Sequence, residues 1–276
     1  MIDIYSLGGF LFYTVAGLCV GSFLNVIIYR LPIMLFATAN KNKVTNIWDK
    51  DSRCKGNINL CLPKSFCPSC NSSLRIMDNI PVVSWLLLRG RSRCCHQRIS
   101  FRYLIVELLT AILTLLIAFW AKSDYLTMIG LLLIWVLITL SFIDLDCYLL
   151  PDCITLPLLW MGLILNIDNV FCSLSSAVLG AVVGYIFLWL PYWLFKLFKG
   201  IDGMGYGDFK LMAAMGAWFG VSTIPMLVLL SSSLGIIVSI VISYLSKKKG
   251  GYIAFGPYIC LAGGINLFLG DAIGLF

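Results

Sequence analysis

Long apolar runs make up most of the chain, and a single long polar stretch interrupts them at 31–102. A helix needs about 20 apolar residues to cross the hydrocarbon core of a bilayer, because each residue adds about 1.5 Å. On this criterion we predict eight transmembrane helices. They correspond to the apolar runs at 4–28, 103–121, 126–143, 153–167, 171–195, 209–222, 224–245 and 252–274. The runs at 153–167 and 209–222 are shorter than a full crossing, so a miscount would fall there.

The composition requires the same environment. The chain of 276 residues is 60% hydrophobic and only 12% charged, whereas soluble globular domains are about 25% charged. A soluble fold of this composition would expose large apolar patches, and a disordered chain would have far less to bury. We therefore predict an all-α polytopic membrane protein embedded in a lipid bilayer.

The positive charges predict the orientation of these helices. The stretch 30–102 carries 13 of the 20 Lys and Arg residues, and basic loops stay on the cytoplasmic side of a membrane. With eight crossings and the N-terminus outside, every basic residue except Lys122 lies in the cytoplasm. No basic residue precedes the first apolar run, so we expect a retained helix rather than a cleaved signal peptide. The net charge of +7 thus reports topology, and no nucleic-acid partner is expected.

The polar stretch contains six of the 11 cysteines. Thiols remain reduced in the cytoplasm, so a metal site is favoured over a disulfide. The motif Cys67-Pro-Ser-Cys70 and the pair Cys94-Cys95 are spaced as in zinc ribbons, which predicts a structural zinc ion. The alternative is a set of buried thiols without a metal. His96 is the only histidine, which excludes Ser-His and Cys-His catalytic schemes and His-based catalytic metal centres.

The acidic residues provide the candidate chemistry. Five aspartates fall at two predicted cytoplasmic membrane edges, namely Asp144, Asp146, Asp152, Asp202 and Asp208. Asp144 ends an apolar run without a spacer, and Asp208 follows three alternating glycines and begins a short apolar run. An acid at membrane depth is costly and indicates function. Two such acids that share a low-dielectric site divide one proton, so that one keeps it while the other activates water. The alternative interpretation is that these acids are solvated helix caps.

Two other hypotheses use the same residues. A proton- or metal-coupled transporter with a cytoplasmic metal-sensing loop would use the acids for coupling, although transporter acids are expected nearer the bilayer midplane. A membrane thiol oxidoreductase would use Cys67 and Cys70, but their loop is predicted to face the reducing side. Glu107, in the second apolar run, is expected to pair with Arg98 or Arg102, with a catalytic role as the alternative.

Glycines four residues apart predict close helix packing. They are Gly17 with Gly21, Gly180 with Gly184, and Gly216 with Gly220.

A set of motifs in one order along the chain resembles the bacterial type IV prepilin peptidases. They are Gly21-Ser-Phe-Leu-Asn-Val26, Tyr29-Arg-Leu-Pro32, Leu62-Pro-Lys-Ser-Phe-Cys-Pro-Ser-Cys70, Asn79-Ile-Pro-Val-Val-Ser84, Leu88-Arg-Gly90, Ile99-Ser-Phe-Arg-Tyr103, Ile143-Asp-Leu-Asp146, Leu150-Pro-Asp152, Gly203-Met-Gly-Tyr-Gly-Asp-Phe-Lys210 and Phe255-Gly-Pro-Tyr258. The resemblance implies an intramembrane aspartic protease of the GxGD type. Asp144 and Asp208 would be its catalytic pair, and the supporting residues would be Asp146, Asp152, Gly205, Gly207, Lys210 and Glu107.

The resemblance also implies a four-cysteine metal site, and this chain departs from that pattern. Cys67, Cys70 and Cys95 match three of the family's cysteines, whereas Ser92 stands at the third position. Cys94, His96 or Cys61 would have to replace it, and Cys94 is the nearest in sequence. Leu104 also replaces the family's proline after the tyrosine.

The substrates implied by the resemblance are type IV prepilin or pseudopilin precursors. The enzyme removes their basic leader at the cytoplasmic face of the inner membrane and usually N-methylates the new terminus with S-adenosylmethionine. Asp146, Asp152 and Asp202 are suited to attract a basic leader, with Lys210 moderating their field. We expect a first transmembrane helix at 1–30, a cytoplasmic loop domain at 31–102 and a seven-helix peptidase core at 103–276.

Overall fold

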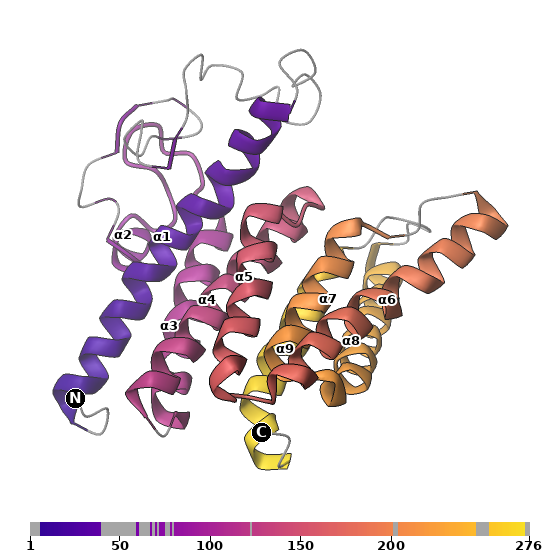
Figure 1. Ribbon diagram of the computed structural model, residues 1–276. Coiled ribbons are helices and arrows are strands. Elements are labelled where there is room, and N and C mark those ends of the chain that lie inside the picture. Colours follow the sequence, from indigo (N-terminus) through magenta and orange to yellow (C-terminus); the bar gives the residue numbers. More distant parts are fainter. Residues whose placement is uncertain are drawn as a thin grey trace. The chain divides into compact units, whose positions relative to one another are not determined.

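The computed structural model describes residues 6–39, 59–60, 67, 70, 72–74, 78, 80–121, 123–200, 204–246 and 254–273. Its longer helices are α1 (Leu7–Ala39), α3 (Phe101–Trp120), α4 (Asp124–Cys147), α5 (Asp152–Leu165), α6 (Leu174–Lys199), α7 (Tyr206–Phe219), α8 (Ile224–Ser246) and α9 (Gly256–Ile273). Each predicted apolar run falls on one of these helices, which confirms the all-α class (Figure 1). One short helix, α2 (Val83–Leu87), lies in the polar stretch.

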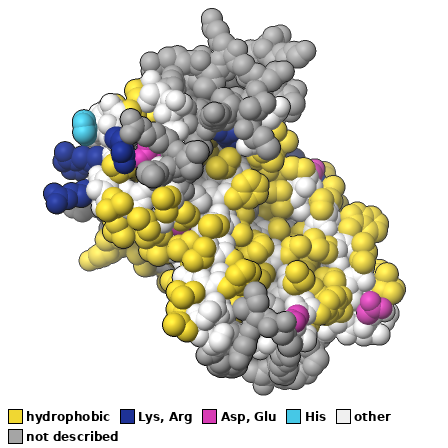
Figure 2. All heavy atoms as spheres, turned by 90° about the vertical axis from the view of Figure 1, so that its left-hand side faces the viewer, with side chains coloured by type: hydrophobic (Ala, Val, Ile, Leu, Met, Phe, Trp, Pro, Cys, Tyr) yellow, Lys and Arg dark blue, Asp and Glu magenta, His cyan; other side chains and the backbone are white. Residues whose placement is uncertain are grey.

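Five helical stretches among the described residues are long and apolar enough to cross a membrane. They are Leu7–Phe36, Phe101–Trp120, Asp124–Cys147, Leu174–Lys199 and Val221–Leu245. α5 and α7 have 14 residues each, about 21 Å of helix, which is less than the hydrocarbon thickness. The number of eight crossings therefore stays a prediction. The protein is a multi-pass membrane protein. Hydrophobic side chains predominate among the coloured ones in Figure 2, and Lys and Arg gather at the upper left.

The first helix is longer than the apolar pattern indicated. α1 continues through Pro32 to Ala39, beyond the expected end of the first run at residue 28. The chain forms two compact units, Met1–Trp135 and Val136–Phe276, each of which is described by itself below. The expected division at residues 30 and 102 stays a prediction.

In the first unit, α1 packs against α3 through its glycines. A Cβ atom on Gly17 would lie 2.7 Å from the Cα of Ala111, and one on Gly21 would lie 2.8 Å from the Cα of Glu107. These distances leave no room for a side chain, so only glycine allows the two backbones to approach this closely. The packing role predicted for this glycine pair is confirmed.

In the second unit, α7 is enclosed by its neighbours. From Leu211 to Phe219 every residue of α7 is buried, and the helix packs against α5, α6 and α9. Gly180 of α6 meets Gly216 of α7 backbone to backbone, which confirms the packing role of those glycines. Because protein rather than lipid surrounds α7, this helix does not need the length of a lipid-exposed span.

The far end of α7 is fixed by Asn166, which lies just after α5 and is fully buried. Its Nδ2 donates to the carbonyl oxygens of Ala217 (2.8 Å) and Trp218 (2.9 Å). Its Oδ1 accepts from the backbone N–H groups of Phe171 (3.0 Å) and Cys172 (3.1 Å). One side chain thus satisfies the last carbonyls of α7 and the turn before α6, and it holds α7 in register with its neighbours.

Candidate active site

Asp144 lies in the last turn of α4, where the chain turns sharply. The helix ends at Cys147, and Tyr148 adopts a left-handed conformation with φ 52°. This turn directs Leu150 into the protein, where it is 7% exposed, and places Pro151 at the start of α5. Asp144 itself is 5% exposed. The acid that interrupts the apolar pattern is therefore buried rather than a solvated cap.

Asp208 lies in the first turn of α7, and it is 7% exposed. Gly205 caps this helix, and its carbonyl oxygen accepts from the backbone N–H of Asp208 at 3.2 Å. A Cβ on Gly207 would lie 2.7 Å from the Cβ of Leu150. Glycine at 207 is therefore required so that the start of α7 can approach the turn that follows Asp144.

The two aspartates lie within electrostatic range of each other. The Oδ2 atom of Asp144 accepts a hydrogen bond of 3.0 Å from the backbone N–H of Gly256, at the start of α9. The Oδ1 atom of Asp208 is buried and has no hydrogen-bond partner in the part of the chain that the structure describes. One acid is thus held by the backbone, while the other presents an unsatisfied oxygen that a water molecule or a substrate can use.

Two residues of α9 next to the acids, Gly256 and Cys260, had no role predicted from the sequence. A Cβ on Gly256 would lie 2.7 Å from the Asp144 Oδ2 and 3.1 Å from the Cδ1 of Leu150, so this glycine closes the site from the α9 side. The Cys260 thiol is buried, hydrogen-bonds with Ser141 and lies within electrostatic range of both acids. The signal for Gly256 was present in the Phe255-Gly-Pro motif near the start of the last apolar run, but spacing alone does not show which element this glycine contacts.

The supporting acids that the structure describes are exposed, unlike the buried Asp144 and Asp208. Asp146 is exposed on α4, and Asp152 begins α5 with its side chain 57% exposed. Both oxygens of Asp152 lie 2.7 Å from the Nζ of Lys210, and the moderating role of that lysine stays a prediction. Asp202 lies outside the described residues.

The expected role of Glu107 was wrong. Its carboxylate, which lies in α3 of the first unit, accepts from the backbone N–H of Val82 at 2.8 Å and hydrogen-bonds with the Ser22 side chain. Neither Arg98 nor Arg102 is among the partners that the structure gives this carboxylate within the described residues. The physical reason is that Val82, at the start of α2, lies next to Glu107, and its backbone N–H donates the hydrogen bond that an arginine was expected to donate.

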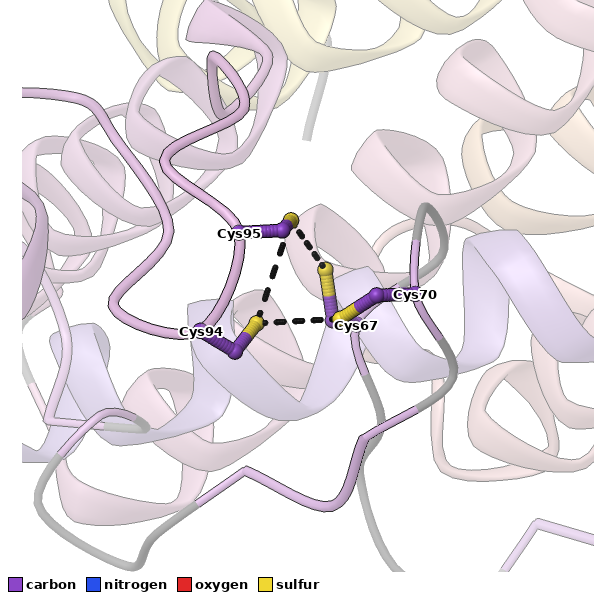
Figure 3. A group of neighbouring side chains, drawn as sticks. All are labelled: Cys67, Cys70, Cys94 and Cys95. Atoms are coloured by element: carbon purple, nitrogen blue, oxygen red, sulfur yellow. Dashed lines mark hydrogen bonds between the residues drawn. The ribbon is translucent and has the colours of Figure 1, made fainter.

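Four of the cysteines in the first unit come together as a cluster (Figure 3). Cys67, Cys70, Cys94 and Cys95 have Sγ atoms that all lie within 4.8 Å of one another. The separations are 3.6 Å for Cys67 with Cys95, 3.2 Å for Cys70 with Cys94, and 3.9 Å for Cys94 with Cys95. Tetrahedral zinc with Zn–S bonds of about 2.3 Å needs Sγ atoms about 3.8 Å apart, so the donor set fits a zinc ion.

A tight turn allows adjacent cysteines to join one cluster. Arg91 and Arg98 form an antiparallel bridge, the N–H of His96 donates to the Ser92 carbonyl at 2.9 Å, and His96 has φ 56°. Ser92 is buried with its Oγ 3.1 Å from the Sγ of Cys95, beside the cluster. Cys94 is therefore the fourth thiol of the cluster, and its role as a metal ligand stays a prediction. His96 is exposed, and Cys61 lies outside the described residues.

Hydrogen bonds favour the metal-binding form of these thiols. The Ser72 side chain lowers the pKa of Cys70 and of Cys94, and the Ser92 side chain lowers the pKa of Cys95. A lower pKa means more thiolate at neutral pH, and the thiolate is the form that binds metals.

Comparisons with known proteins agree with this arrangement. Residues 15–121 match the bacterial peptidase A24 N-terminal domain, and residues 131–240 match the type IV leader peptidase family. The prepilin leader peptidase/N-methyltransferase of Aeromonas hydrophila is 48% identical over 267 residues, which cover 93% of this chain and 89% of that protein. Proteins of the same name from Neisseria gonorrhoeae and Pseudomonas putida are each 46% identical, over 94% of this chain and 90% of their own length.

The paired acids and membrane helices are typical of a membrane-embedded peptidase, and the comparisons identify its family. The chain belongs to the type IV leader peptidase family. No solved structure matches it. The transporter hypothesis finds no support among these relatives.

Proposed function

We propose that the chain is an aspartic endopeptidase that removes the basic leader from type IV prepilin or pseudopilin precursors. The observation that carries this proposal is the buried pair of Asp144 and Asp208, which lie within electrostatic range of each other at two helix ends. The relatives named prepilin leader peptidase/N-methyltransferase support the substrate class. The same names support methylation of the new N-terminus by this chain.

The catalytic chemistry requires the two acids to act as a unit. Two carboxylates that interact in a low-dielectric site do not both ionise, so the pair shares one proton. The ionised partner takes a proton from an attacking water, and the protonated partner polarises the scissile carbonyl. The Gly256 N–H holds the Asp144 carboxylate in one orientation, and the unpartnered Oδ1 of Asp208 is the acceptor available to the water.

The substrate's own charges would bring its cleavage point to this pair. A prepilin has a basic leader before an apolar helix, so the leader stays on the cytoplasmic side. Asp146 and Asp152 are exposed near the buried pair and would attract that leader, while Lys210 neutralises part of their charge. We infer that the active site faces the cytoplasm and that the protein resides in the inner membrane.

Two cofactors belong to this proposal. A zinc ion held by Cys67, Cys70, Cys94 and Cys95 would stabilise the fold of the polar stretch, because the acids supply the hydrolytic chemistry. S-adenosylmethionine, when bound, supplies the methyl group for the new terminus.

The test uses the purified full-length protein in detergent with a prepilin substrate and intact mass as the readout. Asp144→Asn and Asp208→Asn should each lower leader removal by at least a thousandfold, because neither acid can replace the other. Asp146→Asn is the matched control, since it removes an exposed acid of the same motif, and it should retain activity. Addition of S-adenosylmethionine should add one methyl mass to the wild-type product. Full cleavage by either of the first two variants would disprove the assignment of the pair.

Orientation is tested separately. A reporter that is active only in the cytoplasm should work when fused after Lys249, and one that is active only in the periplasm should work after Phe276. Both positions lie outside the described residues, so the experiment tests the charge pattern. The reverse result would mean an odd number of crossings.

A further inference from the structure

The buried acid Glu107 has no part in the proposed peptidase chemistry. It lies in the second turn of α3, in the first unit, and is 8% exposed. Its Oε2 atom accepts from the backbone N–H of Val82, and its carboxylate also hydrogen-bonds with Ser22. Both partners are neutral. Within the described residues, this carboxylate is therefore a buried acid without a positive charge to balance it.

A buried acceptor without a partner lies on the facing helix, α1. Asn25 of α1 is 5% exposed, and its Nδ2 donates to the carbonyl oxygen of Tyr103 at 3.1 Å. Its Oδ1 atom is buried and has no hydrogen-bond partner in the described part of the chain. Gly21 precedes Asn25 by one turn and directly faces the backbone of Glu107. The two helices thus bring an unbalanced carboxylate and an unused acceptor to the same interface.

The backbone near Glu107 is strained. Val82 has φ 59°, a left-handed conformation that a β-branched residue rarely adopts. Strain of this kind persists where the surrounding structure imposes it, and it is concentrated at functional sites. Here the strained residue is the one whose N–H orients the Glu107 carboxylate.

These groups have the chemistry to bind a cation that carries N–H donors. An uncompensated buried acid is costly, and a buried acceptor without a partner is rare in native proteins. A positively charged ligand would balance the carboxylate, and an N–H group of the same ligand would satisfy the Asn25 oxygen. Helix packing alone requires neither group, since the glycines already provide the close contact between α1 and α3.

We propose that Glu107 and Asn25 form a binding site for an organic cation used in N-methylation. This inference rests on the proposed function and deepens it. The shared chemistry is a positively charged onium group, which is available from two sources. One is the sulfonium of S-adenosylmethionine, whose amino group offers N–H donors. The other is the N-terminal ammonium of the cleaved pilin.

The experiment compares ligands that differ in charge, with full-length protein in detergent and binding measured by calorimetry. One pair is S-adenosylmethionine and S-adenosylhomocysteine, which lacks the sulfonium charge. The other pair is a peptide of the mature pilin N-terminus with a free amine and the same peptide N-acetylated. Glu107→Gln keeps the shape of the side chain and removes its charge. It should weaken binding of one cationic ligand about tenfold or more and leave its neutral counterpart within twofold, and the affected pair identifies the source.

Two further variants separate this role from packing. Glu107→Asp keeps the charge and should preserve the preference for the cationic ligand, even if both affinities fall. Thr110→Val alters a fully buried residue one turn further along α3 and should leave the preference unchanged. The inference is overturned if Glu107→Gln binds all four ligands as the wild type does, or if it loses cationic and neutral ligands equally.

Leader removal is measured on the same preparations. A wild-type protein that does not cleave prepilin would refute the proposed function, whereas normal cleavage with an unchanged ligand preference would refute only the cation site.

Discussion

The contact between Gly256 and Asp144 offers a perturbation that should reduce catalysis without unfolding the protein. In Gly256→Ala, the added Cβ would lie 2.7 Å from the Oδ2 of Asp144 and 3.1 Å from the Cδ1 of Leu150. Both atoms are at the ends of side chains, so they can move aside by several tenths of an ångström. Moving the carboxylate, however, breaks its hydrogen bond to the backbone N–H of residue 256, now 3.0 Å long.

The size of the effect follows from that hydrogen bond. A hydrogen bond to a charged group contributes about 1.5–3 kcal/mol, and each 1.36 kcal/mol of lost transition-state stabilisation lowers the rate about tenfold. If the bond matters most when the reacting groups are aligned, kcat should fall about 10- to 100-fold. KM should change little, because the groups proposed to attract the basic leader lie elsewhere, on α4 and α5.

The assay measures initial rates of prepilin cleavage over a range of substrate concentrations, together with the midpoint of thermal unfolding in detergent. Gly235→Ala is the matched control, because its Cβ would lie 3.3 Å from the Cδ2 of Tyr258, a ring that can shift. The control should keep kcat within about twofold. A wild-type kcat in Gly256→Ala would refute the role given to this backbone donor, and a large fall in the unfolding midpoint would mean that the glycine acts through folding.

Three other outcomes are expected. Purified protein should contain about one zinc ion per chain. Cys94→Ser should lower this zinc content, and adding Ser92→Cys to that variant should restore it. A zinc content that Cys94→Ser leaves unchanged would exclude Cys94 as a ligand. Lys210→Ala should lower KM for a substrate with a basic leader about two- to fivefold at low salt, because it removes the positive charge that pairs with Asp152. The effect should vanish at high salt, where exposed charges are screened. A KM equal to that of the wild type at low salt would argue against attraction of the leader by Asp152. Asn166→Ala should lower the thermal midpoint strongly, since four backbone groups, three of them in buried hydrogen bonds, would lose their partner, and each buried one costs about 1–3 kcal/mol. An unchanged midpoint would contradict the role of Asn166 in holding α7.

The motif spacing of the cysteines indicated a metal site but not its fourth ligand. Cys67, Cys70 and Cys95 could be matched along the chain, while Cys94, the nearest in sequence, stood beside His96 and Cys61 as a substitute for Ser92. Among the described residues, the turn at residues 92–97 favours Cys94 over His96 as the fourth member of the cluster. It directs the two adjacent thiols of Cys94 and Cys95 to one point and leaves His96 exposed. Such a turn depends on backbone conformation, which residue types alone do not specify here.

The sequence by itself determined that the chain is a helical membrane protein and that Asp144 and Asp208 are its unusual acids. Hydrophobic length and isolated charges are local properties, and a bilayer penalises exceptions to them strongly. The tertiary structure decided what surrounds those acids. Gly256 donates to Asp144 across 112 positions of sequence, and Val82, not Arg98 or Arg102, holds Glu107. These contacts depend on which backbone groups the packed helices leave free at their ends, and no local pattern encodes that choice.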